Sequence, residues 1–464
     1  MIGRPLMLSA LLGTTLLLGG CASSNLADSL QQARRDTASF TQGNLQLAQT
    51  VAERAEQMER ASKLLQNPLQ QAEAVQLALH NSPALQAMLA EHWANQAQTA
   101  QAGSINNPLL QWSRLKTGGE LSIERTLSFG LLDLLLLPKR QQVAQHRLQQ
   151  QQLDLAAQVI QQVTQVRQAW VRAVAAQQSL AYARQVLASA EASAELARRM
   201  QAAGNFSKLM RVRQQVFYAD AATQLANSQQ YVTSTREELV RALGLDQQQA
   251  DQLRLPERLP DLPATVRDAA SVSQGFASGR LDIRMAQAAL AASGQEQGLN
   301  WISSLSDVEL GLRRDSAADS TSRGFEIGLR LPLFTLGQEQ RAAMNAQTLM
   351  HANRLQATVN AASSQLRDSY ASYRSSYDIA RHYREEVVPL RKIILDENML
   401  RYNGMLSSIF EVLADAREQI QSVIGAINAE QQFWLADAAL QAAMVGAPVQ
   451  TPSGNENTMT GSAQ

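Results

Sequence analysis

Two long stretches without glycine or proline constrain this chain more than any other feature. The first lies between Pro138 and Gly204, and the second runs from Gln338 to Val388. An α-helix rises by about 1.5 Å per residue, so a helix of roughly 65 residues reaches about 100 Å. Because globular domains seldom need helices of this length, the two stretches predict coiled coils or a helical bundle.

Apolar residues in the first stretch support packing between helices. They are spaced alternately by four and three residues, at Val159, Val163, Val166, Trp170 and Ala173. This is the heptad pattern of helices that wind around one another, and small alanines nearby allow close approach. Aromatic residues make up 5% of the chain, which suits thin helical packing better than a thick core. A simple helical rod without a pore fits the same pattern.

The chain is duplicated with a period of about 200 residues. Residues 74–92 parallel residues 272–290, and each long stretch leads to the pattern Gly-x-x-Ser-x-apolar. A repeat of this size has to be recognised before any fold is assigned, since it implies two copies of one structural unit.

The repeated pattern predicts a tight turn at the end of each long helix. Gly204 and Gly404 are expected to end these helices in the left-handed conformation, which glycine adopts without steric penalty. Ser207 is then a candidate cap of the first returning helix, and Ser407 or its neighbour Ser408 of the second.

Each predicted repeat consists of a helix, two strands, a long helix and a return helix. The first repeat, 68–244, has strands at about 108–116 and 120–130, a long helix at 138–203 and a return helix at 206–243. The second, 265–445, has strands at about 306–314 and 323–333, a long helix at 336–403 interrupted at Pro389, and a return helix at 405–443. The arm 21–67 and the proline-rich linker 245–264 are expected to form a belt around the helices, and 446–464 a disordered tail.

The predicted strands of the second repeat alternate strictly between apolar and polar residues. Residues 308–314 and 324–334 place apolar side chains on one face, and Glu309, Arg313, Glu326 and Arg330 on the other. In a soluble protein the apolar face would cover a core, but the sequence offers no second sheet to pack against it. The same alternation is typical of outer-membrane strands, with apolar residues toward lipid and charges toward a wet lumen.

The first repeat is less regular. Arg125 falls in phase with Leu121, Ile123, Leu127 and Phe129. Either Arg125 lies near a membrane interface, or the register of this strand differs from the one assumed.

Four strands cannot close a barrel, and an open strand edge cannot stand in lipid because its backbone groups lack partners. Closure therefore requires several copies of the chain. Two copies would give eight strands and three would give twelve.

The N-terminus predicts export and lipidation. Residues 1–20 have the shape of a signal peptide, because the apolar run from Leu6 to Leu18 is too short to span a bilayer. The following Leu-Gly-Gly-Cys resembles a bacterial lipobox, in which Cys21 would carry the acyl chains, and Ala22 favours sorting to the outer membrane. Cys21 is the only cysteine, so an intrachain disulfide is excluded. The alternative is an ordinary signal with a chance cysteine.

Taken in order, these features resemble the TolC-type outer-membrane efflux channel family over almost the whole mature chain. The resemblance depends on Cys21, the duplicated plan, "LRLPLFTLGQEQRAAMNA" at 329–346 and "RYNGMLSSIFEVLADARE" at 401–418. It implies a mainly α fold with a small β part, in which a homotrimer forms a twelve-stranded outer-membrane barrel and a coiled-coil helical barrel in the periplasm. It also implies docking of the helical tips to a periplasmic adaptor of an inner-membrane pump, and passive export of small molecules or ions.

The resemblance also points to a constriction at the helical tips. Family members often carry aspartates just after the turn, where this chain has Glu411 and Asp415. These residues are four apart and share a helix face, so three copies would gather six carboxylates in one ring. Arg401 and Tyr402 are candidates to hold neighbouring hairpins together. The alternative is an exposed acidic pair that is bridged to Arg417 or Arg211.

Other function classes receive little support. Lys+Arg and Asp+Glu balance at 41 each, so nothing attracts the whole chain to nucleic acid. There is no glycine-rich phosphate loop and no His-Glu-x-x-His, and the five histidines are scattered, so neither an enzyme, a cofactor nor a metal site is predicted. Two rivals remain, a periplasmic adaptor with its single long hairpin and a non-conducting structural lipoprotein that spans the envelope.

Overall fold

The computed structural model describes residues 26–41, 45–117, 120–274, 279–303, 307–316, 321–330 and 338–447. The predicted signal peptide, Cys21 and all but the first two residues of the predicted tail lie outside these ranges. The chain divides into two compact units. Unit 1 contains the strands and the helical segments that adjoin them (1–33, 89–155 and 282–360), and unit 2 contains the remainder, including both long-helix turns.

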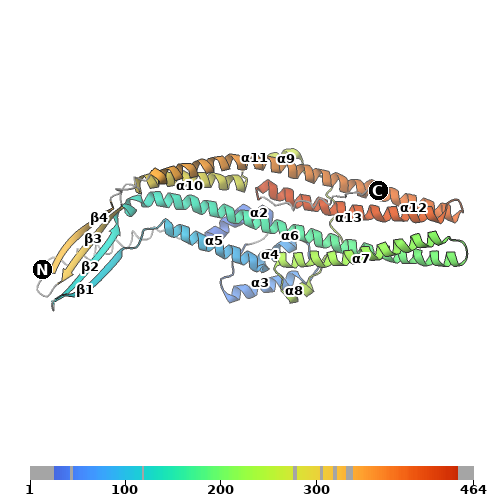
Figure 1. Cartoon of the computed structure of the whole chain (residues 1–464), viewed down its shortest axis with the longest axis horizontal. Helices are drawn as coiled ribbons and strands as arrows, with labels where there is room; N and C mark the ends of the chain where they lie inside the picture. Colours follow the sequence, from blue (N-terminus) through green and yellow to red (C-terminus); the bar gives the residue numbers. More distant parts are fainter. Residues whose placement is uncertain are drawn as a thin grey trace. The chain divides into compact units, whose positions relative to one another are not determined.

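The elements follow one order twice (Figure 1). The first half contains α2 (Leu26–Thr41), α3 (Val51–Leu64), α4 (Gln71–Asn81), α5 (Pro83–Ala102), β1 (Leu109–Thr117), β2 (Glu120–Gly130), α6 (Leu131–Ala202) and α7 (Lys208–Leu243). The second contains α8 (Gln247–Gln252), α9 (Ala269–Gln274), α10 (Leu281–Ser303), β3 (Asp307–Ser316), β4 (Thr321–Arg330), α11 (Gln338–His382), the π-helical turn η2 (Tyr383–Val387), α12 (Val388–Asn403) and α13 (Ile409–Val445). The predicted mainly α fold with four strands in two repeats is therefore confirmed.

The four strands of unit 1 form one antiparallel sheet in the order β1-β2-β3-β4. Each hairpin comes from one repeat, and the pairing of β2 with β3 joins the two repeats. The observed strand bounds lie within three residues of the predicted ones, while 331–333 lie outside the described residues. Because the order is linear, β1 and β4 are edge strands.

Helix α6 starts seven residues earlier than predicted, at Leu131, and contains Pro138. The apolar run that follows β2 is rich in leucine, a strong helix former, and it becomes the first two turns of α6. Asp133 in the first turn accepts hydrogen bonds from Asn106 Nδ2 at 2.7 Å and Arg140 Nη1 at 3.0 Å. Its carboxylate lies so close to Gly130 that a Cβ there would approach Asp133 Oδ2 to 2.9 Å. These contacts fix the junction between strand and helix.

The second long helix is interrupted by a π-turn rather than ended by Pro389. Proline has no N–H and collides with the preceding turn of a regular α-helix. The chain widens to η2 just before it, where the Val388 N–H bonds to the Tyr383 carbonyl, and then continues as α12. The Tyr383 ring packs on Gly425 of α13, where a Cβ would come within 2.6 Å of Tyr383 Cε1. The predicted interruption at Pro389 thus takes the form of one wide turn.

Aromatic residues from α11 and α13 form the centre of one hydrophobic cluster in unit 2. Phe433 is fully buried and contacts the rings of Tyr373, Tyr377 and Trp434, with centroids 5.0–5.6 Å apart. Two side chains of this cluster donate hydrogen bonds to the proline-rich linker. The Tyr377 hydroxyl donates to the Pro263 carbonyl at 3.0 Å, and Trp434 Nε1 donates to the Pro260 carbonyl at 3.1 Å. The linker is therefore held against the helices by specific hydrogen bonds.

In both repeats, a side chain donates a hydrogen bond to a backbone carbonyl at the end of the return helix. The last carbonyl groups of a helix lack partners within the helix. Asn81 Nδ2 donates to the Gly244 carbonyl at the end of α7, at 2.9 Å. The buried guanidinium of Arg280 donates to the Ala443 carbonyl in the last turn of α13, at 2.6 Å. Both donors lie just before the helix that leads to the strands of their repeat. In each repeat, these hydrogen bonds therefore join the end of the return helix to the start of that helix.

Candidate functional site

One face of the sheet carries charged side chains that interact across strands. Arg313 of β3 forms ion pairs with Glu124 of β2 and, at 3.0 Å, with Asp315 of its own strand. Ser113 of β1 donates to Glu124 at 3.1 Å. Because side chains alternate between faces along a strand, these residues share one face with Glu309 and Glu326. This face provides a polar surface.

Three of the four predicted lumen residues lie on this charged face, namely Glu309, Arg313 and Glu326. Arg330 is the last residue of β4 and stands opposite Asp307 in the register, but its side chain lies outside the described residues. Glu124 was not predicted as part of this face. The pairing of Thr126 with Arg313, which brings Glu124 close to it, joins the two halves of the sequence and leaves no local signal.

Apolar residues cover the opposite face near the helical ends of the strands. One cross-strand row consists of Leu110, Leu127, Leu312 and Phe325, and the next of Phe129, Leu310 and Ile327. Arg125 lies on this face, directly opposite Trp112 and Arg314. The strand phase assumed from the sequence therefore holds. Arg125 stands where the wholly apolar rows end, and Ile123 and Leu121 of β2 follow it on the same face.

The first long-helix turn has the expected geometry. Gly204 has φ 79°, the left-handed conformation, and the next N–H, that of Asn205, bonds to the Met200 carbonyl at 2.9 Å. Ser207 caps α7 by accepting a hydrogen bond from the Met210 N–H at 3.3 Å. The return helix begins at Lys208, two residues later than predicted.

The second turn differs from the prediction at Gly404 and selects the second of the two candidate caps. Gly404 has φ −80°, and Met405, with φ 62°, adopts the left-handed conformation instead. Ser408, not Ser407, caps α13 by accepting from the Glu411 N–H at 3.4 Å, whereas the Ser407 hydroxyl donates to the Glu411 carboxylate. The cause is a shift of one residue, because in both turns the cap is the third residue after the left-handed one.

The predicted acidic pair lies in the first two turns of α13. Glu411 is exposed, and the half-buried Asp415 accepts a hydrogen bond from Asn398 Nδ2 of α12. Neither carboxylate has an ion-pair partner among the described residues, so the proposed bridges to Arg417 and Arg211 do not form within the chain. The side chains of Arg401 and Tyr402 likewise form no hydrogen bond to the described part of the chain.

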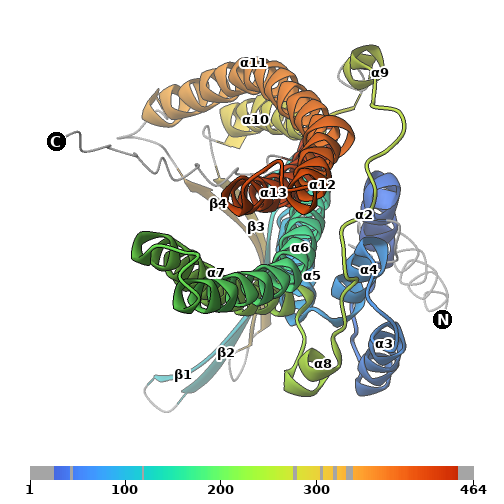
Figure 2. The same cartoon turned by 90° about the vertical axis from the view of Figure 1, so that its right-hand side faces the viewer.

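Hairpin 1 (α6 and α7) and hairpin 2 (α12 and α13) are neighbours (Figure 2), and their side chains are in contact near the turns. The rings of Phe206 and Phe410 lie 5.2 Å apart. Arg417 of α13 donates to Gln214 of α7 at 3.3 Å, and its guanidinium stacks 4.5 Å from the centre of the Phe217 ring. Arg417 therefore joins the two hairpins instead of neutralising the acidic pair. The contacts also show that both turns lie at the same level.

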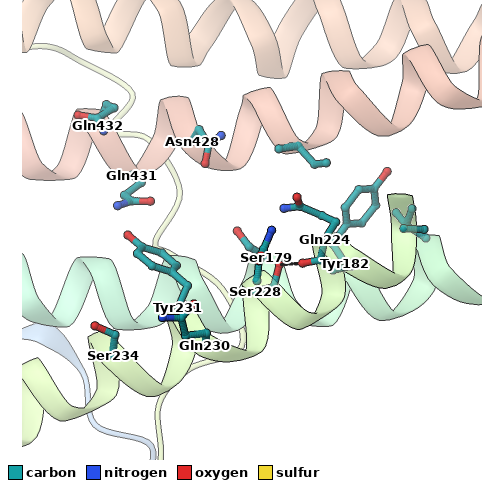
Figure 3. A pocket seen from close by; sticks show the side chains of 15 residues that line it. Ser179, Tyr182, Gln224, Ser228, Gln230, Tyr231, Ser234, Asn428, Gln431 and Gln432 are labelled. Carbon is teal, nitrogen blue, oxygen red and sulfur yellow. Dashed lines mark hydrogen bonds between the residues drawn. The ribbon is translucent and has the colours of Figure 1, made fainter. Parts of the chain in front are cut away.

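A cavity of about 650 Å³ lies between α6, α7 and α13 (Figure 3). None of its lining residues is charged, and most are polar: Ser179, Tyr182, Gln224, Asn227, Ser228, Gln230, Tyr231, Ser234, Asn428, Gln431 and Gln432. Burial raises the pKa of the Tyr182 hydroxyl, which therefore stays protonated at neutral pH. The cavity offers hydrogen-bond donors and acceptors to water or to an uncharged polar molecule.

No family model and no curated protein matches the sequence. Solved structures match over most of its length. A membrane protein from Pseudomonas aeruginosa has a TM-score of 0.68 at 20% identity and covers 83% of this chain and 93% of its own. The outer membrane protein VceC of Vibrio cholerae has a TM-score of 0.66 at 15% identity, with 84% and 96% covered. The Campylobacter jejuni outer membrane channel CmeC has a TM-score of 0.68 at 13% identity, with 84% and 86% covered.

The chain has the TolC-type channel fold. The resemblance that the sequence motifs indicated is thereby confirmed at the level of the fold. In the described part of the chain, no helix is long and apolar enough to cross a bilayer. Nor does the described part contain a cluster of three or more metal-ligating side chains.

Two features of the structure were not predicted from the sequence. The polar cavity was missed, although Gln224 and Tyr231 of α7 are seven residues apart and mark one helix face. Three arginines on the apolar face of the sheet were also missed as a group, because Arg125, Arg314 and Arg323 come together only through the strand register.

Proposed function

We propose that the chain is one subunit of an outer-membrane exit duct, through which small molecules or ions pass from the periplasm to the exterior. The observation that carries this proposal is the four-stranded sheet, which has a charged face, an apolar face and two edge strands. A sheet with one apolar face and open edges is unsuited to water or to lipid when it stands alone.

Closure by further copies of the chain removes both edges at once. β1 of one copy pairs with β4 of the next, and three copies give a twelve-stranded barrel whose charged faces line a wet lumen. In this arrangement Glu309, Arg313, Glu326 and Arg330 belong to the lumen. Cys21 is the proposed lipid anchor of each copy in the outer membrane of a Gram-negative bacterium.

Exposed apolar stripes on the two hairpins support assembly from several copies. Leu209, Val212 and Val216 of α7 are 61%, 42% and 53% exposed. At 100° per residue they lie opposite the buried positions Gln214 and Ala221 of the same helix. This stripe therefore faces away from the rest of its own chain.

Helix α12 has a matching stripe. Leu390, Ile393, Ile394 and Leu400 are 41–63% exposed, and Glu397 lies among them. Since both turns lie at one level, α12 of a second copy would run antiparallel to α7 and place Leu400 beside Val212. Glu397 would then face Arg213, which flanks the α7 stripe. Apolar surface and opposite charge thus favour the same pairing.

Cysteine cross-linking of Val212→Cys/Leu400→Cys tests this assembly. In outer-membrane fractions the double variant is expected to give covalent dimers and trimers, whereas an equal mixture of the two single variants gives dimers only. Gln215→Cys/Leu400→Cys is the matched control, because Gln215 lies on another face of α7, and the wild type with Cys21 alone is the blank. If an amine cross-linker also finds only monomers, the proposed duct is wrong and a non-conducting scaffold is favoured. A single adaptor-type hairpin is already at odds with the two hairpins of this fold.

The helical tips are the proposed periplasmic mouth. Glu411 and Asp415 of three copies would form an acidic constriction, which favours cations. Met405 and Leu406 are 94% and 76% exposed at the turn, so they offer an apolar contact to a periplasmic adaptor of an inner-membrane pump. Replacing Glu411 by Gln and Asp415 by Asn is expected to reduce cation preference in planar-bilayer recordings. Unchanged selectivity would remove these two residues from the constriction.

A further inference from the structure

A row of three arginines crosses the apolar face of the sheet. Arg125 of β2 stands opposite Arg314 of β3, which stands opposite Arg323 of β4, and Trp112 of β1 completes the row. All four side chains are exposed. Neighbouring strands lie about 4.8 Å apart, so the three guanidinium groups span roughly 10 Å.

This row stands where the wholly apolar rows of the face end. Toward the helical ends of the strands, the next row on the same face is Leu110, Leu127, Leu312 and Phe325. Toward the hairpin turns, the same face becomes mixed. Arg114 and Lys116 of β1 lie there opposite Ile123 and Leu121 of β2, and Ser316 and Thr321 of β3 and β4 continue the first of these rows. Two residues along a strand cover about 6.8 Å, so the arginine row lies one step from the nearest wholly apolar row.

Among the described strand side chains, the face that carries the arginine row has basic residues but no acidic ones. The four acidic strand residues whose side chains the structure describes, Glu124, Glu309, Asp315 and Glu326, all belong to the charged face. The arginine row, Arg114 and Lys116 have no ion-pair partner among the described residues. Like charges directly opposite one another destabilise a sheet, so a row of three arginines needs anions from outside the chain.

We infer that the arginine row binds phosphate groups of anionic lipid headgroups at the membrane surface nearest the hairpin turns. This inference rests on the proposed function, because it requires the apolar rows to face lipid. Arginine offers paired N–H donors that fit phosphate oxygens, and its long stem reaches from apolar surface to the headgroup level. Trp112 suits the same depth, since aromatic residues with a polar group gather at membrane interfaces.

The place of the arginine row along the strands agrees with a location at the membrane interface. An arginine on the lipid face of a barrel is costly at the midplane and nearly neutral near an interface. The wholly apolar rows lie on the helical side of the arginines, whereas the described residues on the turn side of this face are basic or hydroxyl-bearing except for Ile123 and Leu121 of β2. The row therefore marks where the hydrocarbon layer ends, and the lipid phosphates lie there.

The test is lipid binding by the purified assembly in native mass spectrometry. The variant Arg125→Gln/Arg314→Gln/Arg323→Gln removes the row, and Arg313→Gln is the control that removes one arginine from the charged face. Lipid A with two phosphates, phosphatidylglycerol with one and zwitterionic phosphatidylcholine are added separately, and inorganic pyrophosphate serves as the free anion.

The wild type and Arg313→Gln are expected to retain lipid A and phosphatidylglycerol in preference to phosphatidylcholine. The triple variant is expected to bind the two anionic lipids at least about tenfold more weakly. Equal binding by the triple variant would overturn the inference, and so would competition by pyrophosphate at the concentration of the lipid. Conductance of the same samples separates the two proposals, because a triple variant that conducts normally but loses lipid leaves the duct intact.

Discussion

Hairpin 1 turns at Gly204, whereas hairpin 2 turns at Met405, one residue beyond the glycine that the sequence repeat aligns with Gly204. In both turns the residue after the left-handed one donates to a carbonyl five residues back. In both, a serine three residues after the left-handed position caps the return helix. Both turns therefore need one residue in the left-handed conformation, but in hairpin 2 the glycine lies one residue before that position.

The helices that lead to the two turns differ as well. Helix α6 is regular over 72 residues, but its counterpart contains the π-turn η2 before Pro389. Gly425 of α13 faces that turn. At this point along hairpin 2, one helix therefore has a π-turn and the other has a residue without a side chain. The two repeats therefore form one hairpin with a regular long helix and one whose long helix is interrupted by a π-turn.

The largest effect on stability is expected where the π-turn η2 of hairpin 2 packs against Gly425. In Gly425→Val, the new Cβ would lie 2.6 Å from Tyr383 Cε1 and force the ring to move. Overpacking of this kind costs about 1–3 kcal/mol. Hydrogen exchange of amides in 380–430 should accelerate accordingly, while hairpin 1 is unchanged. Tyr383→Ala in the same chain should cancel part of the cost, and additive losses would show that the ring and Gly425 are not coupled.

The two turn glycines should respond differently to alanine. Gly204→Ala forces a side chain into the left-handed conformation and should cost about 1–2 kcal/mol of local stability. Gly404→Ala should change stability by less than about 0.5 kcal/mol, because φ is −80° there and the nearest atoms lie 3.5 Å from the added Cβ. Exchange rates of the amides around each turn measure both effects. Equal losses at the two glycines would contradict the shifted turn.

The capping serines sharpen the same comparison. Ser408→Ala should destabilise the start of α13 by about 1 kcal/mol, as Ser207→Ala should for α7. Ser407→Ala is the matched control and should cost less than about 0.5 kcal/mol, because its hydroxyl contacts only an exposed carboxylate. A larger loss for Ser407→Ala than for Ser408→Ala would restore the unshifted alignment.

The smallest expected effect is a gain. Met405→Gly relieves the left-handed strain of a residue that is 94% exposed and has few contacts to lose. Glycine also adds freedom to the unfolded chain, so the net stabilisation should be roughly 0.5 kcal/mol. Slower exchange of the Leu406 amide, whose N–H bonds to the Arg401 carbonyl, would show it. Faster exchange there would mean that the methionine side chain stabilises the turn.

Local patterns in the sequence predicted most of the fold. The strict alternation of 308–314 and 324–334 fixed the strands of the second repeat, and the absence of glycine and proline fixed the long helices. The start of α6 was missed because Pro138 looked like a boundary, although a leucine-rich run before it favours helix. The π-turn was missed because the response of a helix to Pro389 depends on packing against Gly425.

The candidate sites were less accessible from the sequence. A one-residue shift in the second turn cannot be read from a repeat whose glycines align, so Gly404 was assigned the conformation that belongs to Met405. For the same reason the choice between Ser407 and Ser408 as the cap stayed open. The arginine row and the Glu124–Arg313 pair depend on the pairing of β2 with β3, which lie about 180 residues apart in the chain. Contacts between distant strands leave no periodic signal.

Single-channel recording of the purified, detergent-solubilised protein in a planar bilayer tests the central claim most directly. The account predicts discrete conductance steps of one size from samples that cross-link as trimers. Trimers that insert without conducting, or conductance from samples that contain only monomers, would contradict it.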